Sequence, residues 1–158
     1  PTHPEFQTIP ALEDRLVAIV GKEYPHHFPN DRNVTLEEIA RQDMVLIETD
    51  TDYDLVRLFK DTPYKWKARV ITDDANATLK MVEHDMGVGI FPITYLSNMS
   101  EDIDVYEIET DFKRTLALAY TDLKNASPVM KRFVQFIKES ESTRFAAFNH
   151  IKAVNDPK

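Results

Sequence analysis

The chain has 158 residues, a formal net charge of −8 at pH 7 and no cysteine. Its length fits one ordinary domain or one domain with a fragment of another, and a hydrophobic content of 42% excludes a disordered chain. So acidic a chain repels phosphate backbones, which argues against direct nucleic-acid binding, and the lack of thiols excludes disulfides and thiolate metal sites. No apolar run has membrane-spanning length, and residues 1–5 show no signal-peptide pattern. No initiator methionine begins the chain, so we expect either an artificially expressed piece or a processed piece.

Apolar runs alternate with helical patterns along the first half. Residues 16–20 form a buried strand that Gly21 stops. Thr35, with Glu38 three positions later, predicts a capping box that begins a helix reaching about Gln42.

A second strand and helix follow. Residues 44–47 form the strand, and Thr51 or Asp52 then caps a helix that Pro63 closes. A third strand is expected at residues 67–71. The buried face of the helix should hold Leu55, Val56 and Phe59.

The stretch "HDMGVGIFP", residues 84–92, holds two of the three glycines of the chain. Asp74 caps the helix before it, whose apolar face carries Leu79, Val82 and Met86. That helix must end near Gly87, where a positive φ is wanted, and Gly89 lets the strand at residues 88–91 start close behind it. The two glycines therefore serve a tight helix-to-strand switch.

The last third adds strands at residues 105–108 and 115–120. Ser127 before Pro128 predicts the start of a final helix. The apolar face of that helix is expected to hold Val129, Phe133, Val134 and Ile137. Strands that alternate with helices at this spacing predict an α/β fold with a mostly parallel sheet flanked by helices.

Four stretches in order give a resemblance to the effector-binding domain of LysR-type transcriptional regulators, over about residues 11–139. They are "ALEDRLVAIVGKEYP", "VTLEEIARQDMVLIE", "DDANATLKMVEHDMGVGIFPITYL" and "KRTLALAYTDLKNASPVMKRFVQFIKE". One departure stands out: the family's switch reads V-x-x-G-x-G, and from Val82 its first glycine position falls on Asp85. Because Asp tolerates the left-handed conformation better than most residues, we expect the turn to survive.

The resemblance implies a periplasmic-binding-protein-like type II fold of two α/β lobes with a ligand cleft between them. Residues 12–108 would be lobe two, and residues 109–158 the returning strand, C-terminal helix and tail of lobe one. The winged helix-turn-helix and the first part of lobe one would be lacking. The resemblance further implies a cytoplasmic sensor of a small-molecule effector, homodimeric or tetrameric in the full-length regulator, with no cofactor, no membrane contact and DNA binding only through the N-terminal domain.

Helix N-termini and strand carboxyl ends line such clefts, because their unpaired N–H groups can hold a ligand. Three loops qualify, at residues 48–51, 72–74 and 91–94. The predicted ligand-binding residues are the hydrogen-bonding Thr49, Thr51 and Thr94, the helix-capping Asp74, and Phe91 as an apolar wall. Thr51 and Asp74 also fit plain helix caps. The acid-rich "ETDTDYD" fits a solvated helix start, or, if it faces the cleft, a preference for cationic or neutral effectors.

Other polar groups suggest no chemistry. His26 and His27 lack the spacing of a metal site, and the consecutive residues 83–85 point in different directions. Arg114 is expected to pair with a hinge carboxylate such as Glu107 or Asp111. No catalytic set is found, so an enzyme on this fold is disfavoured.

A transporter's solute-binding protein and a structural interaction domain remain alternatives to the sensor. In the family, pairing of effector domains uses elements that match residues 54–59 and 67–71. Apolar surface on the strand at residues 115–120 would favour self-association.

Overall fold

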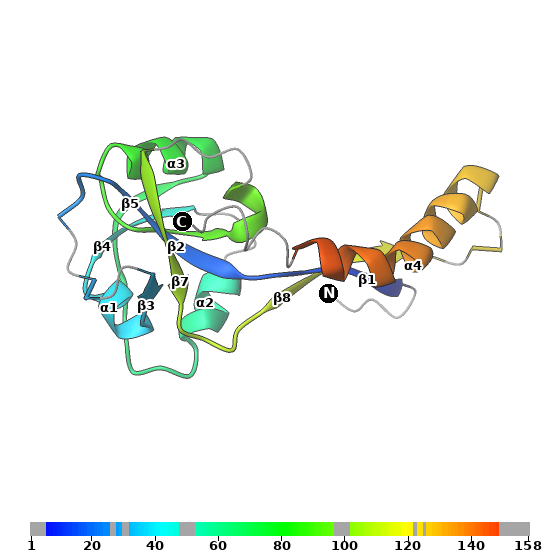
Figure 1. Cartoon of the computed structure of the whole chain (residues 1–158), viewed down its shortest axis with the longest axis horizontal. Coiled ribbons are helices and arrows are strands. Elements are labelled where there is room, and N and C mark those ends of the chain that lie inside the picture. The colour runs from blue at the N-terminus through cyan, green and yellow to red at the C-terminus, as the bar shows by residue number, and fades with distance from the viewer. Residues whose placement is uncertain are drawn as a thin grey trace. The chain divides into compact units, whose positions relative to one another are not determined.

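The chain divides into two units in the computed structural model (Figure 1). The larger is Arg15–Lys113, and the smaller joins Pro1–Asp14 to Arg114–Lys158. The structure describes residues 6–25, 28–29, 32–47, 53–96, 102–121, 123–124 and 126–148.

Strand β2 (Leu16–Gly21), buried at every position, lies inside the sheet of the larger unit. It pairs antiparallel with β6 (Gly89–Pro92) on one side and with β7 (Ile103–Ile108) on the other. Strand β3 (Asn33–Val34) then pairs parallel with β7. A wholly apolar strand suits this place, because both of its faces are covered.

Two further strands extend this sheet beyond β6. Strands β4 (Asp43–Ile47) and β5 (Lys67–Thr72) pair parallel, and a parallel bridge between Met44 and Val88 joins β4 to the chain entering β6. There the backbone N–H of Val45 donates to the carbonyl of Val88 at 2.9 Å. Strands β3, β4, β5, β6 and β7 therefore run in one direction, and β2 runs against them, which confirms the predicted mostly parallel sheet.

Helices cover both faces of this sheet. Helices α1 (Leu36–Ala40) and α2 (Tyr53–Phe59) share a core with Ala18 and Val20 of β2, whereas α3 (Ala75–Glu83) shares one with Val17 and Ile19. Successive strand residues point to opposite faces, so β2 feeds both cores. Figure 1 shows α3 above β2 and β4, and α1 and α2 below these two strands.

The predicted helix caps at Thr35 and Asp74 are present, whereas the one at Thr51 or Asp52 lies outside the described residues. The N–H of Glu38 donates to the Thr35 hydroxyl at 3.2 Å, and the N–H of Thr35 donates to the Glu38 carboxylate at 2.8 Å. This capping box begins α1, which ends at Ala40, before the predicted Gln42. Asp74 caps α3 as predicted.

In the smaller unit, β1 (Gln7–Asp14) pairs antiparallel with β8 (Arg114–Tyr120). The sequence patterns did not predict β1. Helix α4 (Pro128–Phe148) begins as expected, with the N–H of Met130 donating to the Ser127 hydroxyl at 3.2 Å. The buried side chains of α4 and of the two strands form one core, which contains Ile9, Tyr120, Val134 and Ile137. No helix among the described residues is both long and apolar enough to cross a membrane.

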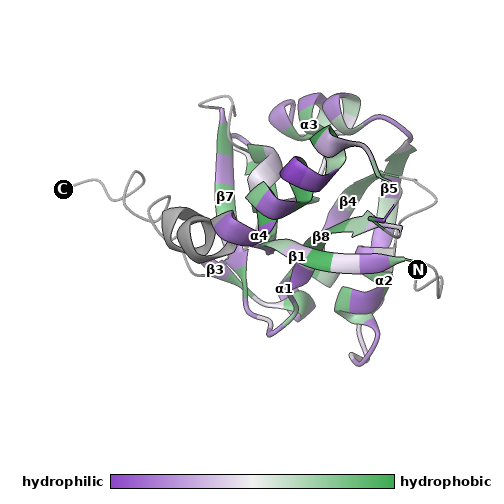
Figure 2. Cartoon of the chain, turned by 90° about the vertical axis from the view of Figure 1, so that its right-hand side faces the viewer, coloured by the Kyte–Doolittle hydropathy of each residue, from purple (hydrophilic) through white to green (hydrophobic). Residues whose placement is uncertain are grey.

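Two helix faces differ from prediction. Val56 is 51% exposed, and Leu58 is buried in its place, because residues 55, 58 and 59 share one face of a helix while residue 56 is turned about 100° from residue 55. On α4, Val129 is 78% exposed and Phe133 47%. Figure 2 shows both hydrophobic and hydrophilic residues on the coloured part of α4. The ribbon of β1 and β8 covers only part of the apolar face of this helix.

The helix-to-strand switch is present, but α3 ends at Glu83, with His84 as its C-cap, earlier than the predicted end near Gly87. Asp85 has a φ of 59° and Gly87 a φ of 156°, so Asp85 adopts the left-handed conformation at the position where the family has glycine. The Oδ1 atom of Asp85 is buried and has no hydrogen-bond partner. It lies where a Cβ on Gly21 would stand.

Replacing Asp85 with glycine should stabilise the fold. Glycine removes both the left-handed strain and the unsatisfied buried oxygen, and we expect Asp85→Gly to raise the free energy of unfolding by about 1 kcal/mol. Urea denaturation measures this change. The control Asp85→Ala keeps the strain and should gain less; a less stable Asp85→Gly protein would contradict the interpretation.

Candidate functional site

The carboxyl ends of β4, β5 and β6 lie at one edge of the sheet, because these three strands are parallel. We call the segments that follow them the carboxyl-edge loops. They are residues 48–52, which lie outside the described residues, residues 73–76, which lead from β5 into the first turn of α3, and the 3₁₀ turn η1 (Ile93–Leu96).

The turn after β5 is held by its own side chains. The N–H of Asp74 donates to the Thr72 hydroxyl at 3.0 Å, and the N–H of Ala77 donates to the Asp74 carboxylate at 2.8 Å. The Thr78 hydroxyl donates to the Asp74 carbonyl at 3.0 Å. The carboxylate of Asp74 thus occupies one N–H at the start of α3, while its side chain stays exposed.

The turn after β6 is tied to its neighbours. The N–H of Ile93 donates to the carbonyl of Arg15 at 2.9 Å, and the Tyr95 hydroxyl donates to Oδ1 of Asn76 at 3.1 Å. The second bond joins η1 to the first turn of α3. Two of the carboxyl-edge loops are therefore in contact.

Two aromatic rings lie in contact at this edge, and only that of Tyr95 is exposed. Phe91 is 1% exposed and lies in the core under α3. Tyr95 is 42% exposed, and its ring centroid lies 5.6 Å from that of Phe91. An aromatic contact with a ligand at this edge is therefore open to Tyr95, which rests on Phe91.

The structure locates only some of the five predicted ligand-binding residues at this edge. Asp74 and Thr94 lie on the two contacting loops, and Thr94 is half-buried. Thr49 and Thr51 lie outside the described residues. Sequence reasoning missed Asn76 and Tyr95; the signal for Tyr95 was an aromatic residue three positions after a strand-ending proline. The assignment of all five predicted residues to a ligand site stays a prediction.

The remaining polar candidates lie elsewhere. Glu83 forms an ion pair with Lys80, and His84 is the exposed C-cap of α3. The adjacent His26 and His27 are outside the described residues. Within the part of the chain that is described, no three His, Cys, Asp or Glu side chains are grouped closely enough to hold a metal ion.

An ion pair marks the opposite edge of the sheet. Lys67 Nζ lies 2.9 Å from Asp43 Oδ1, and these residues begin β5 and β4. The hydrogen bond from Lys67 lowers the pKa of the Asp43 carboxyl. Burial, and then the charge of Asp43, raise the pKa of Tyr24. This electrostatic cluster belongs to the amino ends of the strands.

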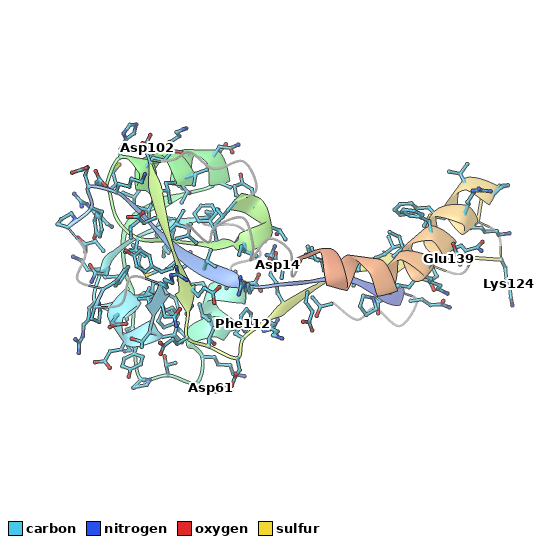
Figure 3. All side chains as sticks on the ribbon, viewed as in Figure 1. Asp14, Asp61, Asp102, Phe112, Lys124 and Glu139 are labelled. Carbon is cyan, nitrogen blue, oxygen red and sulfur yellow. The ribbon has the colours of Figure 1, made fainter. Side chains whose placement is uncertain are left out.

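A buried ion pair closes the ribbon of the smaller unit at the point where its strands meet the larger one. The Asp14 side chain is fully buried, and its Oδ2 lies 2.9 Å from Arg114 Nη2 and 3.0 Å from Arg114 Nε. Figure 3 labels Asp14 at the end of β1. Arg114 was expected to pair with a hinge carboxylate, such as Glu107 or Asp111; the carboxylate that it pairs with is Asp14, which faces it in the register of β1 and β8.

The next residue along the chain forms an ion pair too. Arg15 Nη1 lies 3.0 Å from the carboxylate of Glu107. Asp14 and Arg15 are neighbours in extended chain, so their side chains point to opposite sides. Asp14 is thereby anchored within the smaller unit, and Arg15 within the larger.

Removing the guanidinium of Arg114 should lower the free energy of unfolding far more than the loss of a surface ion pair does. We expect Arg114→Met to lower the free energy of unfolding by about 3 kcal/mol, because the buried Asp14 carboxylate loses its counter-charge. Guanidinium denaturation measures this loss. The control Arg15→Met breaks a half-exposed pair and should cost less than about 1 kcal/mol; equal losses would contradict the special role of Asp14.

Comparisons with known proteins bear on the family. A family model described as LysR substrate binding domain matches residues 1–142. An uncharacterized HTH-type transcriptional regulator, YvbU of Bacillus subtilis (strain 168), is 20% identical over 137 residues, which make up 85% of this chain and 46% of that protein. The chain thus spans about half the length of this curated relative.

Solved structures share the fold. The effector binding domain of QuiR in complex with shikimate has a TM-score of 0.75 and 22% identity, covering 89% of this chain and 67% of that one. The Synechocystis PCC6803 CcmR regulatory domain in complex with 2-PG has a TM-score of 0.72 and 17% identity, covering 84% and 65%. CbnR, a LysR family transcriptional regulator, has a TM-score of 0.73 and 17% identity, covering 89% and 49%.

Proposed function

The chain belongs to the LysR substrate-binding domain family, and from this premise we propose that it is the effector-sensing part of a DNA-binding transcriptional regulator. The observation that carries the proposal is the contact between two carboxyl-edge loops at the start of α3, made by Tyr95 and Asn76. Loops at the carboxyl ends of parallel strands are where open α/β sheets bind ligands. The family is one of regulator domains and not of enzymes, so we assign the chain binding and no catalysis.

We propose that the unit Arg15–Lys113 is lobe two of the effector domain, expected at residues 12–108, and that the other unit is a portion of lobe one, expected at residues 109–158. The separate cores of the two units support this assignment. An effector that prefers one arrangement of the full-length oligomer shifts the population toward it.

We assign ligand contacts to Asp74 and Thr94, with Tyr95 added as the exposed ring and Phe91 as its support. Thr49 and Thr51 remain in the proposed site as residues of the third carboxyl-edge loop. A half-buried hydroxyl, a carboxylate and an aromatic face at one edge fit a small polar molecule.

Partners follow from the same premise. QuiR and CcmR were solved with shikimate and 2-PG, which are small molecules, and this supports a small-molecule effector here. We propose a homodimer or tetramer in the full-length regulator, DNA contact through an N-terminal helix-turn-helix domain, and a cytoplasmic location. The similar proteins include transcriptional regulators, which favours this reading over a transporter's binding protein.

A ligand screen tests the proposal. Thermal unfolding in the presence of amino acids, aromatic acids or sugar phosphates should reveal at least one ligand that raises Tm by about 5 °C near saturation. Thr94→Val should then weaken that ligand about tenfold in calorimetry, because a hydrogen bond to the hydroxyl is lost.

Thr115→Val is the matched control, because Thr115 is an exposed threonine on β8. It should leave the affinity unchanged. If no ligand shifts Tm in a longer chain that holds both lobes, the sensor proposal fails.

A further inference from the structure

The carboxyl-edge loops carry acidic side chains and no basic ones. Residues 73–76 read "DDAN" and η1 reads "ITYL", so these two loops supply the carboxylates of Asp73 and Asp74 but no Lys, Arg or His. Both carboxylate side chains are exposed. The third loop, residues 48–52, has the sequence "ETDTD", which is acidic too. A ligand group at this edge therefore meets negative charge.

Basic side chains gather at the opposite edge of the same strands. Arg41 precedes β4 as the C-cap of α1, Lys60 and Lys65 lie between α2 and β5, and Lys67 begins β5. All four are exposed. Because β4 and β5 run in parallel from this edge to the other, the length of the strands separates these cations from the carboxylates of the loops. The potential at the carboxyl edge is therefore favourable for a cation.

The start of α3 does not offer an anion site, although helix N-termini commonly bind anions through their free N–H groups. Here the Asp74 carboxylate accepts the N–H of Ala77 at 2.8 Å. The negative charge that a helix N-terminus attracts is thus supplied by the chain itself. An anionic ligand group would meet this carboxylate and be repelled.

The exposed ring of Tyr95 is held in place from two sides. Its hydroxyl donates to Oδ1 of Asn76 at 3.1 Å, and its ring centroid lies 5.6 Å from that of Phe91. The first contact ties the ring to the helix turn that follows Asp74. The face of an aromatic ring attracts a cation through its quadrupole, so the ring and the carboxylates favour the same charge.

We propose that the carboxyl-edge loops hold a positively charged group of the effector, a primary or quaternary ammonium. The carboxylates of Asp73 and Asp74 attract this group, and the ring of Tyr95 lies against it. This inference rests on the proposed function, because it names the chemistry that the same site recognises. It concerns the part of the effector that these loops contact.

A titration of the isotope-labelled 158-residue chain, followed by amide chemical shifts in NMR, tests the inference. The probes are two pairs with the same carbon skeleton and opposite charge: benzylamine with benzoate, and cadaverine with glutarate. We expect the two amines to shift the amides of residues 73–77 and 94–96 with millimolar affinity, and the two carboxylates to leave them unshifted. The spectrum of each sample also shows whether the chain is folded.

Two variants test the residues. Asp74→Asn removes the charge but keeps a side chain that caps helices equally well, and Tyr95→Leu removes the ring. Each should weaken the binding of benzylamine about threefold. The matched control is Asp61→Asn, an equal change of charge at an exposed residue between α2 and β5, near the amino ends of the strands. It should leave the affinity unchanged.

Several results would overturn the inference. If benzoate and glutarate shift the loop amides and the amines do not, the inference fails while the sensor proposal gains support. If none of the four probes shifts them, the inference fails too, and the sensor proposal is decided separately by the ligand screen in the longer chain. An equal loss of affinity in Asp61→Asn would attribute the binding to overall charge and not to this site.

Discussion

The larger unit depends on the burial of β2 from both sides. Its residues alternate between the core under α1 and α2 and the core under α3, and its two edges hold β6 and β7. Because one strand supplies both cores and both pairings, the parallel strands take their places relative to it. This arrangement also positions η1, because the N–H of Ile93 donates to the carbonyl of Arg15 directly before β2.

The sequence patterns predicted most elements of the larger unit because the relevant signals there are local. The capping box at Thr35, the cap at Asp74 and the glycine switch each involve residues only a few positions apart. Strand β1 was missed because Pro10 interrupts its alternation and because its partner, β8, lies about a hundred residues away. The partner of Arg114 was missed for the same reason, since Asp14 and Arg114 meet only through that pairing.

The candidate site was predictable as a set of loops but not as a set of contacts. Parallel strands must bring their carboxyl ends together, so Asp74 and Thr94 were placed on neighbouring loops by pattern alone. The hydrogen bond between Tyr95 and Asn76 and the burial of Phe91 depend on which way the side chains of η1 and of the end of β6 point in the folded unit. The spacing of residues in the sequence does not predict these directions. The ring that would face a ligand was therefore assigned to Phe91 instead of Tyr95.

The carboxylate of Asp85 depends on a glycine far away in the sequence. It occupies space that exists because position 21 has no side chain, and a Cβ there would also stand 2.7 Å from the carbonyl of Val82. Gly21 is thus required by the backbone of α3 whatever stands at position 85, whereas Asp85 tolerates no larger residue at position 21. The dependence therefore runs in one direction: the side chain at position 85 needs the glycine at position 21, but the glycine is needed with any residue at position 85.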